Sequence, residues 1–130
     1  MSYDLYFWRE KKPFVGDAGM RVDTLSQERP NPEVDAFPRE DVIDRFEKAF
    51  PEIELDHGQL IWRGFDSGFE VNFCHADKHS VHLIVITCGY KLLDHSEVLN
   101  RIIDVAHSLG CGFYDPQVPQ RYPEPDRAPK

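Results

Sequence analysis

Three strand-length segments follow one another between residues 59 and 88, separated only by short polar turns. The segment 69–74 alternates apolar and polar residues, whereas 81–88 is apolar at almost every position. Alternation is typical of a strand with one buried face, and a continuous apolar run of this length indicates a strand buried on both faces. Because such short turns join antiparallel strands, the sequence predicts a meander with 81–88 in the interior of the sheet.

Two segments on either side of this meander have helical periodicity. Pro38 suits the first turn of a helix, and the apolar residues that follow recur at helical spacing until Pro51. The second predicted helix begins near Ser96 and ends before Gly110, which is placed like a C-terminal left-handed glycine. The predicted shared core comprises Val42, Ile43, Phe46, Phe50, Leu99, Ile102, Ile103 and Ala106 on the helices and Val71, Phe73, Leu83 and Val85 on the sheet.

Two further strands, at 4–8 and 111–114, give the order β-α-β-β-β-α-β. This order predicts an α+β two-layer sandwich, in which two helices cover one face of a mostly antiparallel sheet of four to five strands. A ferredoxin-like core with one extra strand is the nearest standard fold. Glycines and prolines interrupt the pattern from 9 to 33, where we expect only a short extended piece at 20–25.

The length of 130 residues corresponds to a single domain, which needs no metal or disulfide to stabilise it. We expect this domain to span residues 1–115 and to be followed by a surface tail, 116–130, whose five prolines disfavour regular structure. No run approaches the roughly 18–20 apolar residues of a membrane span. The first residues also lack a secretory signal, so the sequence predicts a cytoplasmic protein.

Acidic residues are concentrated in one part of the chain. The whole sequence has 15 basic and 23 acidic side chains, a balance that disfavours binding to nucleic-acid phosphates. Residues 33–56 alone hold nine acidic and three basic side chains, a formal charge of −6. On the predicted helix Glu40, Asp44 and Glu47 share a face, with Asp41 beside them, and such a row of like charges costs stability unless a partner compensates it. The row is either a solvated helix face or a docking surface for a basic partner.

A histidine-containing turn is the alternative candidate site. Cys74, His75, Asp77, His79 and His82 lie close together in the sequence, and all are potential metal ligands. Structural zinc sites usually draw their ligands from two separated pairs, and no second pair is present here. We therefore predict no metal and no cofactor. The His75/His79 turn remains the basis of an alternative function as a small ligand- or metal-binding domain or an enzyme.

The three cysteines Cys74, Cys88 and Cys111 form no C-x-x-C pair and lie in apolar contexts, so we expect buried, reduced thiols. Cys111 follows His107 by about one helical turn, and a nearby cation could lower its pKa. The turn from helix to strand, however, explains the glycines on both sides of Cys111. The sequence contains no nucleophile elbow and no glycine-rich phosphate loop, and we predict a protein without catalytic activity.

The two ends of the predicted domain resemble a known group of proteins. Residues 2–8 (Ser-Tyr-Asp-Leu-Tyr-Phe-Trp) and 109–117 (Leu-Gly-Cys-Gly-Phe-Tyr-Asp-Pro-Gln) are similar to segments of small bacterial immunity proteins. Some of these are encoded beside polymorphic toxins in contact-dependent growth inhibition systems. The resemblance implies a cytoplasmic protein without activity of its own that binds and neutralises one cognate toxin domain, often a nuclease.

The candidate partner-binding residues come from charge placement, because such families share little interface sequence. Carboxylates on the predicted helix and just after it would pair with lysines and arginines in the substrate cleft of the toxin. Aromatic residues often lie at the centre of such interfaces, which adds Trp62 and Tyr122, although Trp62 also fits the core. The candidates are Glu40, Asp41, Asp44, Glu47, Glu54, Asp56 and Trp62, with Tyr122 as a secondary one.

Overall fold

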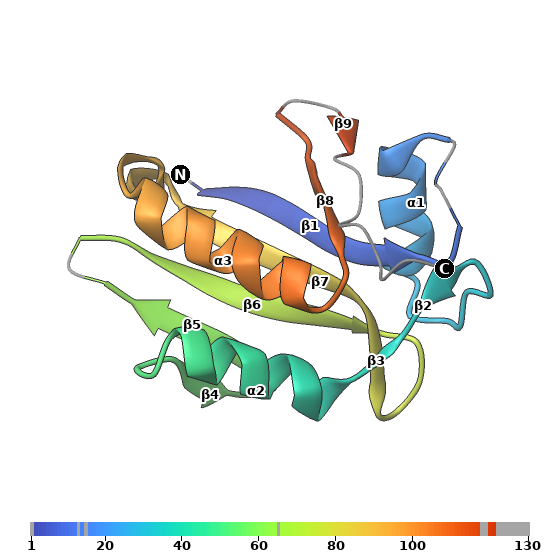
Figure 1. The fold of residues 1–130 in the computed structure, drawn as a ribbon, viewed down its shortest axis with the longest axis horizontal. Coiled ribbons are helices and arrows are strands. Elements are labelled where there is room, and N and C mark those ends of the chain that lie inside the picture. Colours follow the sequence, from blue (N-terminus) through green and yellow to red (C-terminus); the bar gives the residue numbers. More distant parts are fainter. Residues whose placement is uncertain (1, 13, 15, 65, 118–119, 122–130) are drawn as a thin grey trace.

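An open antiparallel sheet organises the part of the chain that the structure describes, which comprises residues 2–12, 14, 16–64, 66–117 and 120–121. In this computed structural model the strands follow the order β4-β5-β6-β7-β1-β8-β9, while β2 pairs with β1 and β3 pairs with β7 (Figure 1). Together with the helices they form an α+β fold. The strands are β1 Ser2–Glu10, β2 Val34–Asp35, β3 Phe37–Pro38, β4 Glu54–Asp56, β5 Gln59–Arg63, β6 Gly68–His75, β7 Ser80–Gly89, β8 Gly112–Asp115 and β9 Gln120–Arg121.

The five strands that the sequence predicts are all present, as β1, β5, β6, β7 and β8. The meander β5-β6-β7 is confirmed, and β7 lies between β6 and β1 in the interior of the sheet. The expected number of four to five strands is wrong, because β2, β3, β4 and β9 extend the sheet. Each of these four has only two or three residues, too few to produce an alternating pattern in the sequence.

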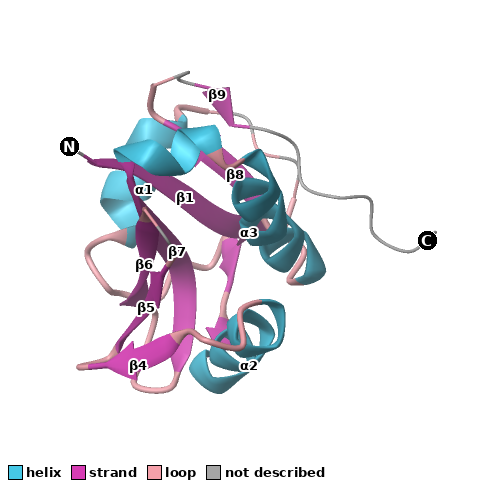
Figure 2. Ribbon diagram, turned by 90° about the vertical axis from the view of Figure 1, so that its left-hand side faces the viewer, coloured by secondary structure: helices cyan, strands magenta, loops and turns pink. Residues whose placement is uncertain are grey.

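Helices α2 (Arg39–Ala49) and α3 (Ser96–Ser108) lie antiparallel to each other on one face of the sheet (Figures 1 and 2). Pro38 is the N-cap of α2 rather than its first helical residue. Gly110 follows α3 with a φ of +78°, in the left-handed region that favours glycine, as predicted. A short 3-10 helix, η1 (Tyr90–Asp94), connects β7 to α3. The main core includes Phe7, Val42, Phe46, Phe50, Val71, Ile84, Ile86, Ile102 and Ala106.

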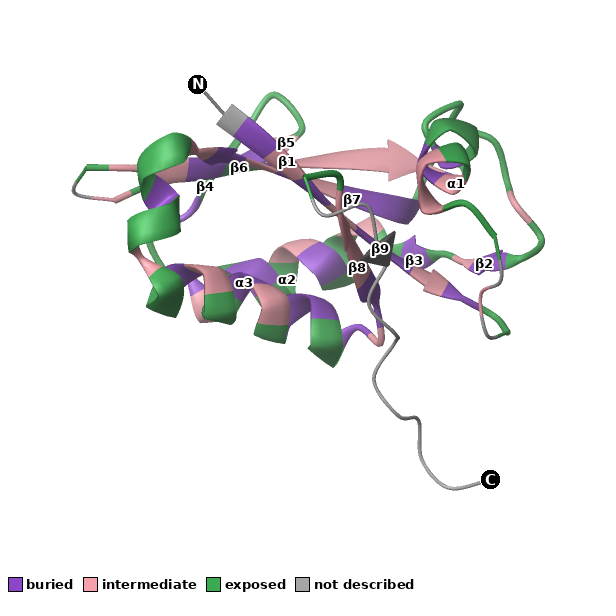
Figure 3. Ribbon diagram, turned by 90° about the horizontal axis from the view of Figure 1, so that it is seen from above, coloured by how far each residue is buried: buried purple, intermediate pink, exposed green. Residues whose placement is uncertain are grey.

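A third helix, α1 (Ala18–Leu25), lies at one end of the opposite face of the sheet (Figure 3). The expected extended piece at 20–25 is therefore wrong, and so is a sandwich with two helices on one face only. The Asp17 side chain caps α1 by accepting a hydrogen bond from the Met20 backbone N–H at 3.0 Å. Only Val22 and Leu25 of this helix are buried, so its apolar stripe is too short to be read as helical periodicity.

The two faces of β7 were assigned incorrectly from the sequence. Phe73 lies on the α2/α3 side of the sheet, as predicted, and its partner in the register is Ile84. Leu83 and Val85 therefore point to the opposite face, where they belong to the second cluster under α1. Because β7 is apolar on both sides, composition alone does not show which set of residues faces which helices.

The sheet continues beyond residue 115, because Arg121 of β9 pairs with Tyr114 of β8. Most of the predicted tail, at 118–119 and 122–130, lies outside the described residues. No helix within the described ranges has the length and apolar character needed to cross a membrane.

Candidate partner-binding surface

Two arginines fix α2 against α3. Arg45 donates from Nη1 to the backbone carbonyl of Ser108 at 2.7 Å, at the end of α3. Arg101 of α3 donates to the carbonyl of Ala49 at the end of α2, and its guanidinium lies 4.2 Å from the centre of the Phe50 ring. The last carbonyls of a helix have no partner within the helix. Each arginine therefore completes the final turn of the other helix, which holds the surface of α2 in a defined orientation.

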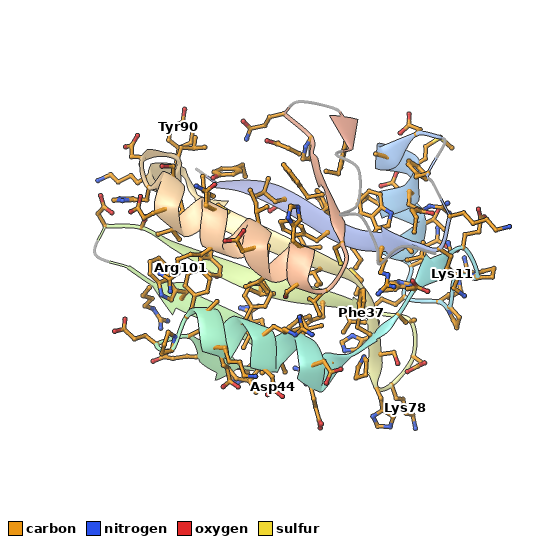
Figure 4. All side chains as sticks on the ribbon, in the orientation of Figure 1. Lys11, Phe37, Asp44, Lys78, Tyr90 and Arg101 are labelled. Carbon is orange, nitrogen blue, oxygen red and sulfur yellow. The ribbon has the colours of Figure 1, made fainter. Side chains whose placement is uncertain are left out.

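Four predicted carboxylates are presented by this fixed helix. Glu40, Asp41, Asp44 and Glu47 are all exposed, and within the described part of the chain none of them has an ion pair or a side-chain hydrogen bond. Arg45 lies on the side of α2 that faces α3, because it donates to Ser108 there, and Asp44 lies on the outer side (Figure 4). At about 100° per residue, Glu40, Asp44 and Glu47 share the side away from α3, whereas Asp41 lies on the flank of Arg45. The structure therefore brings three of the four together.

The other two predicted carboxylates lie on β4, at the edge of the sheet beside α2. Arg39 ties the start of α2 to the turn after β4 by donating to a backbone carbonyl there at 3.1 Å. Glu54 pairs with Arg63 at 2.8 Å and Asp56 with His57 at 2.5 Å, and all four side chains are exposed, so these pairs are weak. The register places Glu54 and Asp56 on the face of the sheet opposite α2, so the two groups of carboxylates meet only along this border. We call the carboxylates along this border the acidic edge: Glu40, Asp44, Glu47, Glu54 and Asp56.

The aromatic candidate Trp62 is placed in the core rather than on the acidic edge. Its ring is stacked on Phe69 at 5.5 Å between centroids and meets Phe50 edge-on at 5.6 Å. A Cβ on Gly64 would approach the indole to 2.6 Å, which shows how closely the chain covers the ring. Trp62 is nevertheless only half-buried. The secondary candidate Tyr122 lies outside the described residues.

Of the histidines of the alternative site, His75 and His82 both interact with Glu28, whereas His79 lies apart from them in a turn. His75 donates its backbone N–H to Glu28 at 3.1 Å, and this hydrogen bond lowers the pKa of the Glu28 carboxyl. His79 is exposed in the turn between β6 and β7. His82 is buried, with Nε2 at 2.8 Å from the backbone oxygen of Leu25, and burial lowers its pKa. The described residues contain no group of three or more histidine, cysteine or acidic side chains arranged to hold a metal ion.

The three cysteines are free thiols. Burial raises the pKa of Cys88 to about 11 and also raises the pKa of Cys74. Both thiols are therefore protonated near neutral pH, whereas a cysteine nucleophile reacts as the thiolate. Cys111 is buried and His107 is exposed. The left-handed backbone at Gly110 accounts for the glycine that precedes Cys111.

A buried charge that the sequence reasoning missed lies near α1. Glu10 is buried and accepts hydrogen bonds from Trp8 Nε1 at 2.7 Å and from Arg21 Nε at 2.8 Å. Arg21 also lies over the Phe14 ring at 5.2 Å, and these residues line a cavity of about 350 Å³. The only signal in the sequence is that Trp8 and Glu10 are two apart on β1 and so share a face. The ion pair anchors α1 to the end of β1.

No protein family, curated protein or solved structure matches this chain.

Proposed function

We propose that this protein is a cytoplasmic immunity protein that binds a cognate nuclease toxin domain and covers its substrate cleft with the acidic edge. The observation that carries the proposal is the row Glu40, Asp44 and Glu47, exposed on a fixed helix and without ion pairs in the described part of the chain. Like charges at this spacing cost about 0.2–0.5 kcal/mol per pair in an isolated helix. A basic partner would convert that cost into a favourable interaction.

The proposed inhibition follows from the chemistry of a nuclease cleft. Such a cleft binds phosphates through lysines and arginines, so a row of carboxylates matches it in charge. Hydrogen bonds between charged groups are about twice as strong as hydrogen bonds between neutral groups. On β4, Glu54 and Asp56 would exchange their weak exposed partners for cations of the toxin. The long-range attraction would also accelerate association before a toxin reaches its substrate.

The double variant Asp44→Lys/Glu47→Lys tests this proposal in cells that express a candidate toxin domain, taken from the product of the gene next to the one that encodes this protein. We expect wild-type protein to restore growth and the double variant to protect much less. Asp94→Lys/Asp104→Lys is the matched control, because both residues are exposed, have no ion pair with any described residue and undergo the same change in charge away from the acidic edge. Equal protection by the two double variants would place the interface elsewhere, and no protection by wild type would refute the proposed function.

A further inference from the structure

Within the described ranges, a helix covers the sheet face opposite α2 and α3 at one end only. Helix α1 places Val22 and Leu25 over Trp8 and Leu83, and these residues form the second cluster. Figure 3 shows α1 at one end of this face and the two longer helices on the other side of the sheet. The middle strands β5, β6 and β7 extend well beyond α1, so part of their surface has no helix over it.

The strand register identifies the residues on this uncovered surface. Ile61 is opposite Glu70, Glu70 opposite Thr87, and Thr87 opposite Asp4, which gives one row across four strands. A neighbouring row runs from Asn72 through Val85 and Tyr6 to Tyr114. Tyr6, Val85 and Tyr114 pack against the cluster under α1 and form the border of this surface. We call these eight residues the open sheet face: Asp4, Tyr6, Ile61, Glu70, Asn72, Val85, Thr87 and Tyr114.

The open sheet face combines half-buried apolar groups with carboxylates. Ile61, Val85, Tyr6 and Tyr114 are all partly accessible, and the two tyrosine rings lie 6.1 Å apart. Aromatic residues are enriched in protein interfaces, and charged residues are typical of the rim around the apolar centre. The open sheet face differs from a solvated sheet face, on which outward positions are occupied mainly by polar residues.

The two charged residues of the open sheet face are acidic, and Arg63, which the register places on the same side of β5 as Ile61, pairs with Glu54 at 2.8 Å. Glu70 is exposed, and its carboxylate has no hydrogen bond or ion pair in the described part of the chain. Asp4 accepts hydrogen bonds from Thr87 Oγ1 at 2.7 Å and from the Tyr6 hydroxyl at 3.4 Å. Burial and the charge of Asp4 raise the pKa of Tyr6, so its hydroxyl remains a donor. At the edge of the sheet, Glu54 of the acidic edge is opposite Ile61 and lies on this same face.

This charge distribution favours a basic partner over a second copy of the same chain. In a face-to-face dimer the carboxylates of Glu70 and Asp4 would meet those of the second copy, which is unfavourable. A surface with lysines and arginines would instead pair with them while its apolar side-chain stems cover Ile61 and Val85. We propose that the open sheet face is a second docking surface, which binds a Lys/Arg-rich segment of a partner protein. This proposal stands independently of the proposed function, because none of the eight residues belongs to the acidic edge.

An NMR titration of the ¹⁵N-labelled full chain with a deca-arginine peptide tests the second docking surface. We expect saturable shifts of backbone amides in β5, β6, β7 and β1, which disappear at high salt. Glu70→Lys should raise the Kd of the peptide, measured from these shifts, about tenfold, because a favourable charge pair becomes a repulsive one. Asp104→Lys, at an exposed position of α3 outside both proposed surfaces, is the matched control and should leave them unchanged.

Two results would overturn the proposal. Shifts confined to α2 and β4 would assign the peptide to the acidic edge, and equal affinity of wild type and Glu70→Lys would show that the open sheet face is not involved. A spectrum of the free variant that matches wild type outside the immediate neighbours of residue 70 establishes that the substitution leaves the fold intact. Should Glu70→Lys disturb the fold, Glu70→Gln replaces it, and an unchanged affinity again overturns the proposal.

Discussion

The imidazole of His82 is enclosed between β7 and the end of α1. Its Nε2 lies 2.8 Å from the backbone oxygen of Leu25 and is placed to donate a hydrogen bond, while the buried Nδ1 atom has no hydrogen-bond partner among the described residues. A second proton would therefore add a buried N–H without an acceptor. The charged groups that act on it are Glu28, which favours protonation, and His75, which opposes it, but burial is the larger effect and lowers the pKa of His82.

We expect acid to destabilise the fold through His82. Because the folded-state pKa lies below the ordinary value of 6.5, the unfolded chain binds the proton more tightly, and stability present at neutral pH is lost as the pH falls below 6.5. The loss is at most about 1.4 kcal/mol per pH unit. His82→Gln keeps an amide N–H near Leu25 but does not titrate. Urea unfolding at about pH 7 and about pH 5 should therefore show a smaller loss of stability in His82→Gln than in wild type. The same loss in both proteins would assign the pH dependence to other groups.

Among the elements, α1 depends most on buried polar contacts. It contributes only Val22 and Leu25 to the core, and Arg21 makes hydrogen bonds with the buried Glu10 at 2.8 and 3.1 Å. Removing one member of a buried ion pair leaves the other charge without compensation, which costs far more than the pair contributes. The docking of α1 is therefore sensitive to a single charged side chain.

Arg21→Met should lower the free energy of unfolding by about 3–5 kcal/mol, because Glu10 loses its cationic partner in a buried position. Combining it with Glu10→Gln should recover much of this loss. Arg29→Met is a control at an exposed arginine in the turn after α1 and should change stability by less than about 0.5 kcal/mol. Chemical denaturation of the four proteins checks the prediction, and equal effects of Arg21→Met and Arg29→Met would contradict a structural role of the ion pair.

The elements differ in how clearly the sequence reveals them. The alternation of Phe69, Val71 and Phe73 and the long stripe of α3 each repeat several times, so β6 and α3 were predictable. Helix α1 was not, because it buries two side chains and is held by Asp17 and by the distant Glu10. The side-by-side placement of α2 and β4 was likewise unpredictable, because it depends on strand pairing rather than on local pattern.

The core beneath α3 gives a direct test of the face assignment. Ile102 is fully buried among residues of both α3 and the sheet, as its helical spacing predicts. Ile102→Asp should lose several kcal/mol of stability, because an unpaired carboxylate would be buried. Asn100→Asp, at an exposed position of the same helix, is the control for the added charge. Thermal melting should show a large decrease for Ile102→Asp alone, and a parent-like melting temperature would contradict the packing of α3.

At the scale of the whole molecule, charge is distributed unevenly. Residues 33–56 carry −6 of the formal −8. The part from α2 to β4 lies along one border of the sheet, whereas Glu33 and Asp35 lie beside β1 and pair with Arg21 and Arg9. The cations Arg45 and Arg101 are directed instead into the junction between α2 and α3, where they bond to helix carbonyls. These two arginines therefore do not neutralise the carboxylates of the acidic edge. A molecule with this arrangement is expected to attract a basic partner towards one side.

The rate at which the neighbouring gene's toxin domain associates with this protein tests the central claim most directly. Stopped-flow measurements should give fast association for wild type that slows as salt is added. Asp44→Lys/Glu47→Lys should associate at least about tenfold more slowly at low salt and show a much weaker salt dependence, whereas Asp94→Lys/Asp104→Lys should behave more like wild type. Equal association rates for the two double variants at every salt concentration would contradict an acidic edge that binds the toxin.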